Sequence, residues 1–159
     1  PYLSDNTVVP RNKNLSDDEN TSRKNEIFDA YHSSIGQQIS VMRSENKNPI
    51  LISLHSFTPV MSGQFRPWEI GILWKDDKRL SAPLIKKLRE QKELNIGDNK
   101  PYSGSEPAGY TVDYHVEPLS LPSVAVEFRQ DLIEFESGAA RWANIFGDAL
   151  DHVLATEVS

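Results

Sequence analysis

Three short, continuous apolar runs constrain the fold of this chain more than any other feature of its sequence. They cover residues 50–54 (ILISL), 70–74 (IGILW) and 123–128 (SVAVEF). Such runs, when turn signals bound them, are typical of strands buried on both faces, as in a parallel sheet. Segments with helical patterns separate the runs. The sequence therefore predicts an α/β fold with a mainly parallel or mixed sheet flanked by helices.

Helices are predicted in three segments. The first begins at Ser16, which has the capping-box spacing with Glu19, and continues to about residue 44. The other two cover residues 81–92 and 137–155, where apolar residues recur every three or four positions. Two segments lack a clear period: residues 95–110 are predicted to form a long loop, and residues 111–116 are ambiguous between helix and strand.

Composition narrows the possible functions. The 159 residues suit a single domain, and the absence of Cys excludes disulfides, thiolate metal ligands and Cys nucleophiles. The net charge is -6 without a cluster of Lys and Arg, so we expect no nucleic-acid partner. No apolar run is long enough to span a bilayer, and no segment resembles a signal peptide. We therefore expect a cytoplasmic protein with no membrane partner.

Polar residues lie where the predicted strands end. His55 follows the first apolar run, Asp76 follows the second, and Glu127 and Arg129 close the third. Ligands of open α/β sheets bind at the carboxyl ends of the strands. These side chains could therefore converge on one edge of the sheet and form a site.

His55 and Glu127 each allow two interpretations. A single His beside a buried strand is more often a hydrogen-bonded structural residue than a metal ligand, although the end of a strand is where a ligand is well held. A carboxylate flanked by apolar residues is costly to bury unless it is paired. Glu127 is thus either the partner of an arginine, Arg66 or Arg129, or a general base whose pKa is raised by desolvation.

Arg66 and Arg129 suggest an anionic substrate, because a guanidinium binds carboxylates through two parallel hydrogen bonds. Alternatively, either arginine pairs with a carboxylate of the chain itself, such as Asp131. His115 also has two interpretations: it could assist catalysis or orient a substrate, or it could lie at the surface or support the site without touching the substrate.

Several motifs occur in order between about residues 4 and 150 and are specific as a set. They include His55-Ser-Phe-Thr-Pro-Val, Arg66-Pro-Trp, Gly97-Asp-Asn-Lys-Pro-Tyr102, Glu127-Phe-Arg-Gln-Asp-Leu132 and Trp142-Ala. Together they resemble the motifs of the N-formylglutamate amidohydrolase family.

The resemblance implies a fold similar to the zinc carboxypeptidases and related phosphorylase-like folds. It also implies hydrolysis of a small-molecule N-acyl amino acid, first of all N-formyl-L-glutamate, to formate and glutamate. In this scheme His55 is a zinc ligand, zinc activates a water molecule, and Glu127 is the catalytic general base that takes the proton. The residues implied in substrate binding are Arg66, Arg129, His115, Asn99, Tyr110 and Thr58.

The chain departs from the family pattern at several places, two of which bear directly on its function. It has Tyr114-His115-Val116 where the family has Arg-His-Ala, which leaves open a different N-acyl or peptide-like amide as the substrate. Family members also carry upstream motifs that should supply the other zinc ligands. We therefore expect residues 1–159 to be the C-terminal two-thirds of one amidohydrolase-like domain lacking its N-terminal strands. The remaining zinc ligands would come from upstream of Pro1 or from a second chain, and a non-catalytic fragment or partner subunit is the alternative.

Overall fold

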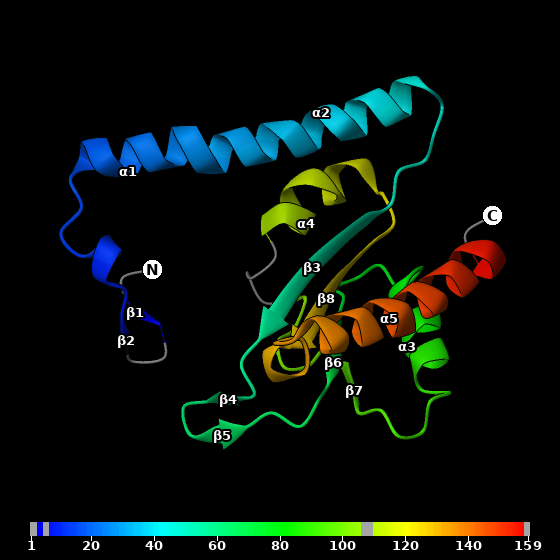
Figure 1. Ribbon diagram of the computed structural model, residues 1–159. Coiled ribbons are helices and arrows are strands. Elements are labelled where there is room, and N and C mark those ends of the chain that lie inside the picture. Colours follow the sequence, from blue (N-terminus) through cyan, green and yellow to red (C-terminus); the bar gives the residue numbers. More distant parts are fainter. Residues whose placement is uncertain (1–2, 5–6, 106–109, 158–159) are drawn as a thin grey trace. The chain divides into compact units, whose positions relative to one another are not determined.

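Two units make up the chain in the computed structural model, residues 1–48 and residues 49–159 (Figure 1). The structure describes residues 3–4, 7–105 and 110–157. The prediction of one amidohydrolase-like domain over residues 1–159 stays a prediction. Within the described residues, no helix combines the length and the apolar character needed to cross a membrane.

One long helical segment dominates the first unit, and the sequence predicts where it begins. The Ser16 hydroxyl accepts a hydrogen bond from the backbone N–H of Glu19 at 3.2 Å, and the Glu19 carboxylate accepts one from the Ser16 N–H at 2.9 Å. This reciprocal pair confirms the capping box. The elements of the unit are β1 (Leu3–Ser4) and β2 (Thr7–Val8), which pair antiparallel, a 3-10 turn (Pro10–Asn12), α1 (Asp17–Arg23), a π-helical segment (Lys24–Asp29) and α2 (Ala30–Ser44).

A four-stranded sheet forms the centre of the second unit. Its strands, in order across the sheet, are β3 (Leu51–Phe57), β8 (Ser123–Arg129), β6 (Ile70–Leu73) and β7 (Ile96–Asp98). β3 runs parallel to β8 and β6 runs parallel to β7, but β6 and β8 are antiparallel. The sheet is therefore mixed, and the carboxyl ends of β3 and β8 lie opposite those of β6 and β7.

Helices cover the sheet, and a hairpin projects beyond it. In Figure 1, α3 and α5 lie on one side of the sheet and α4 on the other. The hairpin turns at Ser62 and Gly63, whose φ angles of 50° and 75° are the positive values that a two-residue type I′ turn requires. These elements are β4 (Val60–Met61), β5 (Gln64–Phe65), α3 (Ser81–Leu88), α4 (Tyr110–His115), α5 (Glu136–Glu157) and two 3-10 turns (Glu117–Leu119 and Gln130–Leu132).

The hydrophobic core of the second unit lies between the sheet and the helices α3 and α5. Because side chains alternate along a strand, Val124, Val126 and Phe128 of β8 share one face. The Phe128 ring lies 6.1 Å from the ring of Trp142 and 6.0 Å from that of Phe146, both on α5. This contact assigns the helix-covered face of the sheet. The helices predicted at residues 81–92 and 137–155 are thus present, although α3 ends earlier than predicted.

Two predictions about strands were wrong. The run at residues 50–54 was expected to be buried on both faces, but Leu54 is 62% exposed. Within the described residues β3 pairs only with β8, so it is an edge strand. The loop predicted at residues 95–110 contains β7, which is only three residues long and includes Gly97, so it has no period to detect. The ambiguous segment 111–116 is mostly helical, as part of α4.

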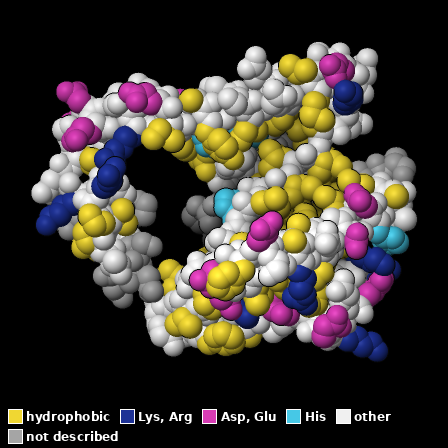
Figure 2. Space-filling model, in the orientation of Figure 1, with side chains coloured by type: hydrophobic (Ala, Val, Ile, Leu, Met, Phe, Trp, Pro, Cys, Tyr) yellow, Lys and Arg dark blue, Asp and Glu magenta, His cyan; other side chains and the backbone are white. Residues whose placement is uncertain are grey.

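Hydrophobic side chains remain visible at the surface of the molecule (Figure 2). In the second unit the most exposed of them are Leu54, Phe65 and Phe135. Phe65 lies on the hairpin and Phe135 precedes α5, so these are not members of the core.

Candidate active site

His55 and Glu127 lie side by side on neighbouring strands. They are register partners in the parallel pair formed by β3 and β8. Partners in a parallel pair point to the same face, and alternation along β8 places Glu127 on the face opposite Phe128. The two side chains therefore lie on the sheet face that α3 and α5 do not cover, near the carboxyl ends of both strands.

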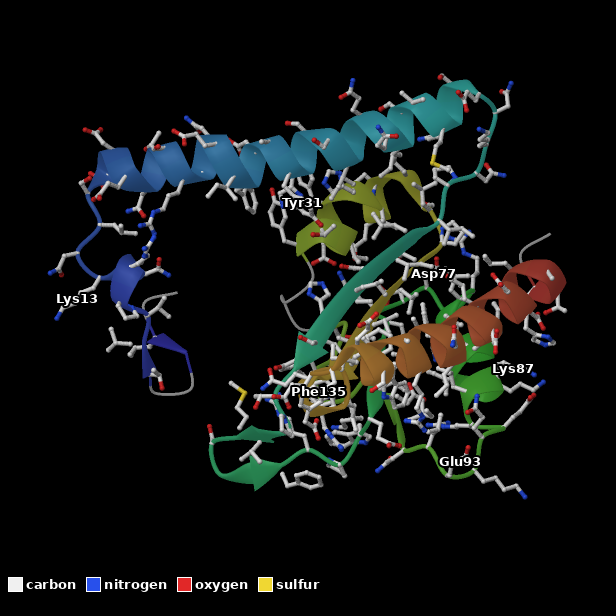
Figure 3. The ribbon with its side chains drawn as sticks, viewed as in Figure 1. Lys13, Tyr31, Asp77, Lys87, Glu93 and Phe135 are labelled. Carbon is white, nitrogen blue, oxygen red and sulfur yellow. The ribbon has the colours of Figure 1, made fainter. Side chains whose placement is uncertain are left out.

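Asp76 does not join them, contrary to the prediction. It follows β6, which runs antiparallel to β8, so it lies beyond the opposite end of the sheet. Figure 3 shows this separation with the labelled residues Asp77, which also follows β6, and Phe135, which follows β8. The rule that ligands bind where strands end holds only for strands that share a direction.

Glu127 is a buried carboxylate with incomplete hydrogen bonding. It is 8% exposed, and its Oε2 atom has no hydrogen-bond partner among the described residues. Burial raises its pKa from the ordinary 4.5 to about 7, and the positive charge of Arg66 opposes part of this rise. A carboxyl group with a pKa close to neutrality can both accept and donate a proton at physiological pH. The alternative of an ion pair with Arg66 or Arg129 is absent among the described contacts.

His55 is exposed, and its ring is oriented by its own strand. The Oγ atom of Ser53 lies 2.8 Å from Nε2. The described part of the chain holds no group of three or more metal-binding side chains. Catalytic zinc sites usually need three protein ligands. The residues present therefore fit one ligand position of a zinc site but not the whole site.

Arg66 is a half-buried cation beside this pair. Its Nη1 donates a hydrogen bond to the Tyr102 hydroxyl at 2.9 Å, and its Nη2 contacts the sulfur of Met61. The guanidinium also lies 5.0 Å from the centre of the Tyr102 ring and 6.0 Å from that of Phe57. No carboxylate within the described residues forms an ion pair with it, although its charge acts on the carboxyl group of Glu127 and lowers the pKa of that group.

The loop that carries Tyr102 packs against the sheet and places Tyr102 beside Arg66. A Cβ atom on Gly71 would lie 2.0 Å from the carbonyl oxygen of Lys100, and one on Gly97 would lie 2.6 Å from the same oxygen. The loop thus passes too close to the sheet for any side chain at either position. Neither glycine was predicted to matter for the site. Gly97 and Tyr102 belong to the motif Gly97-Asp-Asn-Lys-Pro-Tyr102, and this motif is the feature of the sequence that could have identified them.

Asn99, predicted to bind substrate, holds this loop together. Its side-chain oxygen accepts hydrogen bonds from the backbone N–H groups of Trp74 at 2.8 Å and Gly104 at 3.2 Å. Asn99 has a φ of 50°, the left-handed conformation that Asn tolerates better than most residues. The structure therefore gives its oxygen a role in building the loop.

Arg129 is used within the protein. It forms an ion pair with Asp131 at 2.8 Å and donates to the backbone carbonyl of Pro67 at 3.2 Å. Its guanidinium also lies 5.5 Å from the centre of the Phe65 ring. The pairing with Asp131, which the sequence left open, is what the structure shows.

The other predicted substrate-binding residues lie in α4 and at the start of the hairpin. His115 is buried at the end of α4, with its ring edge-on to Tyr114 at 4.9 Å, and Tyr110 stacks on Tyr114 at 5.2 Å. The Thr58 hydroxyl donates to the carbonyl of Val60 at 2.8 Å, which ties the hairpin to β3. Their substrate-binding roles stay predictions.

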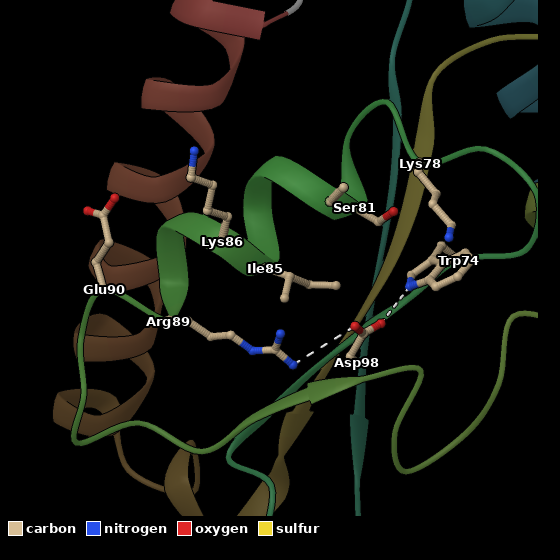
Figure 4. Close-up of a pocket in the computed structure, with 9 residues that line it drawn as sticks. Trp74, Lys78, Ser81, Ile85, Lys86, Arg89, Glu90 and Asp98 are labelled. Atoms are coloured by element: carbon tan, nitrogen blue, oxygen red, sulfur yellow. Dashed lines mark hydrogen bonds and ion pairs between the residues drawn. The ribbon is translucent and has the colours of Figure 1, made fainter.

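A pocket of about 440 Å³ lies elsewhere, beside α3 and the ends of β6 and β7 (Figure 4). In it the indole N–H of Trp74 donates to Asp98 at 2.7 Å, and Arg89 lies 3.9 Å from the same carboxylate. The ammonium group of Lys78 lies 4.1 Å from the centre of the Trp74 ring. These charged groups are engaged with one another, and the pocket is at the opposite end of the sheet from His55 and Glu127.

Comparison with known proteins agrees with this architecture. A gene product of Agrobacterium tumefaciens with a known crystal structure has a TM-score of 0.93 and 28% identity, and the match covers 100% of this chain and 63% of that one. The N-formylglutamate amidohydrolase of Ralstonia eutropha has a TM-score of 0.67 and 17% identity, covering 89% and 57%. The chain thus spans about 63% of the first of these structures. No curated protein matches the sequence significantly.

The family comparison covers most of the sequence. The model for N-formylglutamate amidohydrolase matches residues 1–134, a range that includes His55, Arg66, Tyr102 and Glu127. Taken with the mixed sheet and the paired strand ends, this match shows that the chain belongs to the N-formylglutamate amidohydrolase family.

Proposed function

We propose that this protein hydrolyses the amide bond of an N-acyl amino acid, with N-formyl-L-glutamate as the first candidate substrate. Family membership supports an amidohydrolase. The single observation in the chain that carries the proposal is Glu127, a buried carboxylate with an unpartnered oxygen. A structural carboxylate at that place would be paired, because leaving it unpaired costs stability.

Glu127 is the proposed general base. With a pKa of about 7, a large fraction of the carboxyl group is ionised at neutral pH and can take a proton from an attacking water. The resulting acid can then return that proton to the leaving nitrogen of the amide. Its low exposure limits competing contact with bulk water.

We propose zinc as the cofactor, with His55 as one ligand. When bound, zinc supplies a Lewis acid that activates water and polarises the scissile carbonyl. Because the described residues contain no cluster of three metal-binding side chains, the other ligands would have to come from outside them. The proposed location of the protein is the cytoplasm.

Arg66 is the proposed binding group for a carboxylate of the substrate. It forms no ion pair with a described carboxylate, and it is close enough to Glu127 to lower the pKa of that residue. A cation beside the base suits an N-acyl amino acid, which carries a carboxylate close to its amide.

Hydrolysis of N-formyl-L-glutamate, measured as formate released with and without added zinc, tests the proposal. We expect Glu127→Gln to lower the rate by about 10²- to 10⁴-fold. Glu134→Gln, which changes an exposed glutamate near the end of the same strand, is the matched control and should leave the rate unchanged. Equal rates for the two variants would contradict the role of Glu127.

Metal content and a substrate panel separate this proposal from its alternatives. A non-catalytic partner that has kept the fold would bind no zinc and release no formate. The described residues hold no group of three metal-binding side chains, and this observation favours the alternative. An amidohydrolase of different specificity would bind zinc and hydrolyse another N-acyl amino acid faster than the N-formyl compound.

A further inference from the structure

The hydrogen-bond and ring partners of the half-buried Arg66 side chain are all electrically neutral. They are the hydroxyl of Tyr102, the sulfur of Met61 and the rings of Phe57 and Tyr102. A carboxylate partner would fix the side chain but would also cancel its charge. Neutral partners fix the side chain and preserve the charge for another anion.

These partners come from three separate parts of the second unit. Met61 lies on the hairpin strand β4, Phe57 ends β3, and Tyr102 follows the loop that crosses the sheet at Gly71 and Gly97. The backbone N–H of Arg66 also donates to the carbonyl of Pro59 at 2.8 Å, so both ends of the residue are held. The position of the guanidinium is therefore set by tertiary structure.

Part of the guanidinium's hydrogen-bonding capacity is left over. The two contacts with Tyr102 and Met61 use one donor on each terminal nitrogen, and a guanidinium has further N–H groups in a planar fork. That fork matches the two oxygens of a carboxylate. The remaining donors suit an anion that approaches from outside the cluster.

We propose that Tyr102 is a positioning residue which, together with Met61, holds the guanidinium of Arg66 ready to bind a carboxylate of the substrate. This inference rests on the proposed function, since it names how that site would select an acidic N-acyl amino acid over a neutral one. Tyr102 acts through Arg66 and takes no part in the chemistry. The arginine side chain loses its conformational entropy during folding, so less conformational entropy is lost when the substrate binds.

Binding measurements on the full chain test the inference without requiring turnover. Two probes are titrated calorimetrically: N-formyl-L-glutamate and its uncharged diamide. We expect the unchanged chain to prefer the charged probe. Tyr102→Phe removes only the hydroxyl and keeps the ring, so it should weaken binding of the charged probe by roughly three- to tenfold and leave the diamide unaffected.

Two further variants make the test decisive. Met61→Leu keeps the volume but removes the sulfur, and it should weaken binding of the charged probe by roughly twofold. Tyr31→Phe removes a hydroxyl from an exposed tyrosine in α2 and is the matched control for Tyr102→Phe.

The opposite results would overturn the inference. Equal affinities of the unchanged chain for both probes would do so, as would an unaltered preference for the charged probe in Tyr102→Phe. A parallel loss of affinity for both probes would show a structural role only. Selective binding of the charged probe without any release of formate would refute the proposed hydrolysis and leave the carboxylate site standing.

Discussion

Replacing Glu127 by Gln should make the stability of the protein less dependent on pH. The side chain is nearly isosteric, so the change removes the ionisation of a buried group and little else. In the folded protein the pKa of Glu127 is about 7, and its ordinary value is 4.5. Below pH 4.5 the carboxyl group is protonated in both the folded and the unfolded state. The folded protein then buries no charge at Glu127, so the free energy of unfolding is at its highest with respect to this group.

The sign and the size follow from these two values. As the pH rises above 4.5 the unfolded chain releases the proton while the folded chain keeps it, so the free energy of unfolding falls until the pH passes about 7. The full shift of the pKa from 4.5 to about 7 corresponds to a change of about 3 kcal/mol in the free energy of unfolding. We expect the unchanged protein to lose about 2 to 3 kcal/mol of stability relative to Glu127→Gln between pH 4.5 and pH 8.

Urea unfolding followed by tryptophan fluorescence at several pH values measures this difference. All other titrating groups are common to the two proteins, so they cancel when the two pH profiles are subtracted. Glu134→Gln, at an exposed position, should give a profile parallel to that of the unchanged protein. If the profile of Glu127→Gln is also parallel, the carboxyl group is not desolvated, and the argument for a base with a raised pKa fails.

Four other outcomes are expected from the packing and the site. Gly71→Ala should lower stability by about 1 to 3 kcal/mol or more in urea unfolding, because the new Cβ would lie 2.0 Å from the Lys100 carbonyl oxygen. Gly147→Ala, in the middle of α5 with nothing within 4 Å of the new Cβ, should instead raise it by up to about 1 kcal/mol, and a loss there would contradict the helix assignment. Trp142→Ala should cost about 3 to 5 kcal/mol because the side chain is 1% exposed, and a cost below about 1 kcal/mol would mean that α5 is not packed on the sheet. In steady-state assays kcat/KM should rise with pH through a pKa near 7 as Glu127 ionises, and a profile that is flat between pH 5 and pH 9 would exclude Glu127 as the base.

Local signals in the sequence were sufficient for the helices and for most of the strands. The capping box at Ser16 and the apolar face of α5 each depend on residues a few positions apart, and both are present in the structure. The runs at residues 70–74 and 123–128 became buried strands. β7 escaped prediction because three residues are too few to show a period.

The candidate site could be predicted only in part. The sequence placed His55 and Glu127 at strand ends, and the tertiary structure made them neighbours through the parallel register of β3 and β8. The tertiary structure also places Asp76 away from this site. The sequence could not show this, because the direction of β6 cannot be read from its apolar residues. The tertiary structure also pairs Arg129 with Asp131 and gives Arg66 an uncharged hydrogen-bond partner, Tyr102.

The sequence by itself thus determined which segments form helices and strands and which residues carry chemistry at their ends. Periodicity and capping act over one or two turns of chain, so they can be read locally. Strand order, strand direction and the burial of Glu127 were decided only by tertiary structure, because they depend on hydrogen bonds and packing between segments far apart in the chain. Tertiary structure also decides the close approach of the Lys100 backbone to Gly71 and Gly97. The two glycines can be read in the sequence, but the position of the Lys100 carbonyl oxygen that makes them necessary cannot.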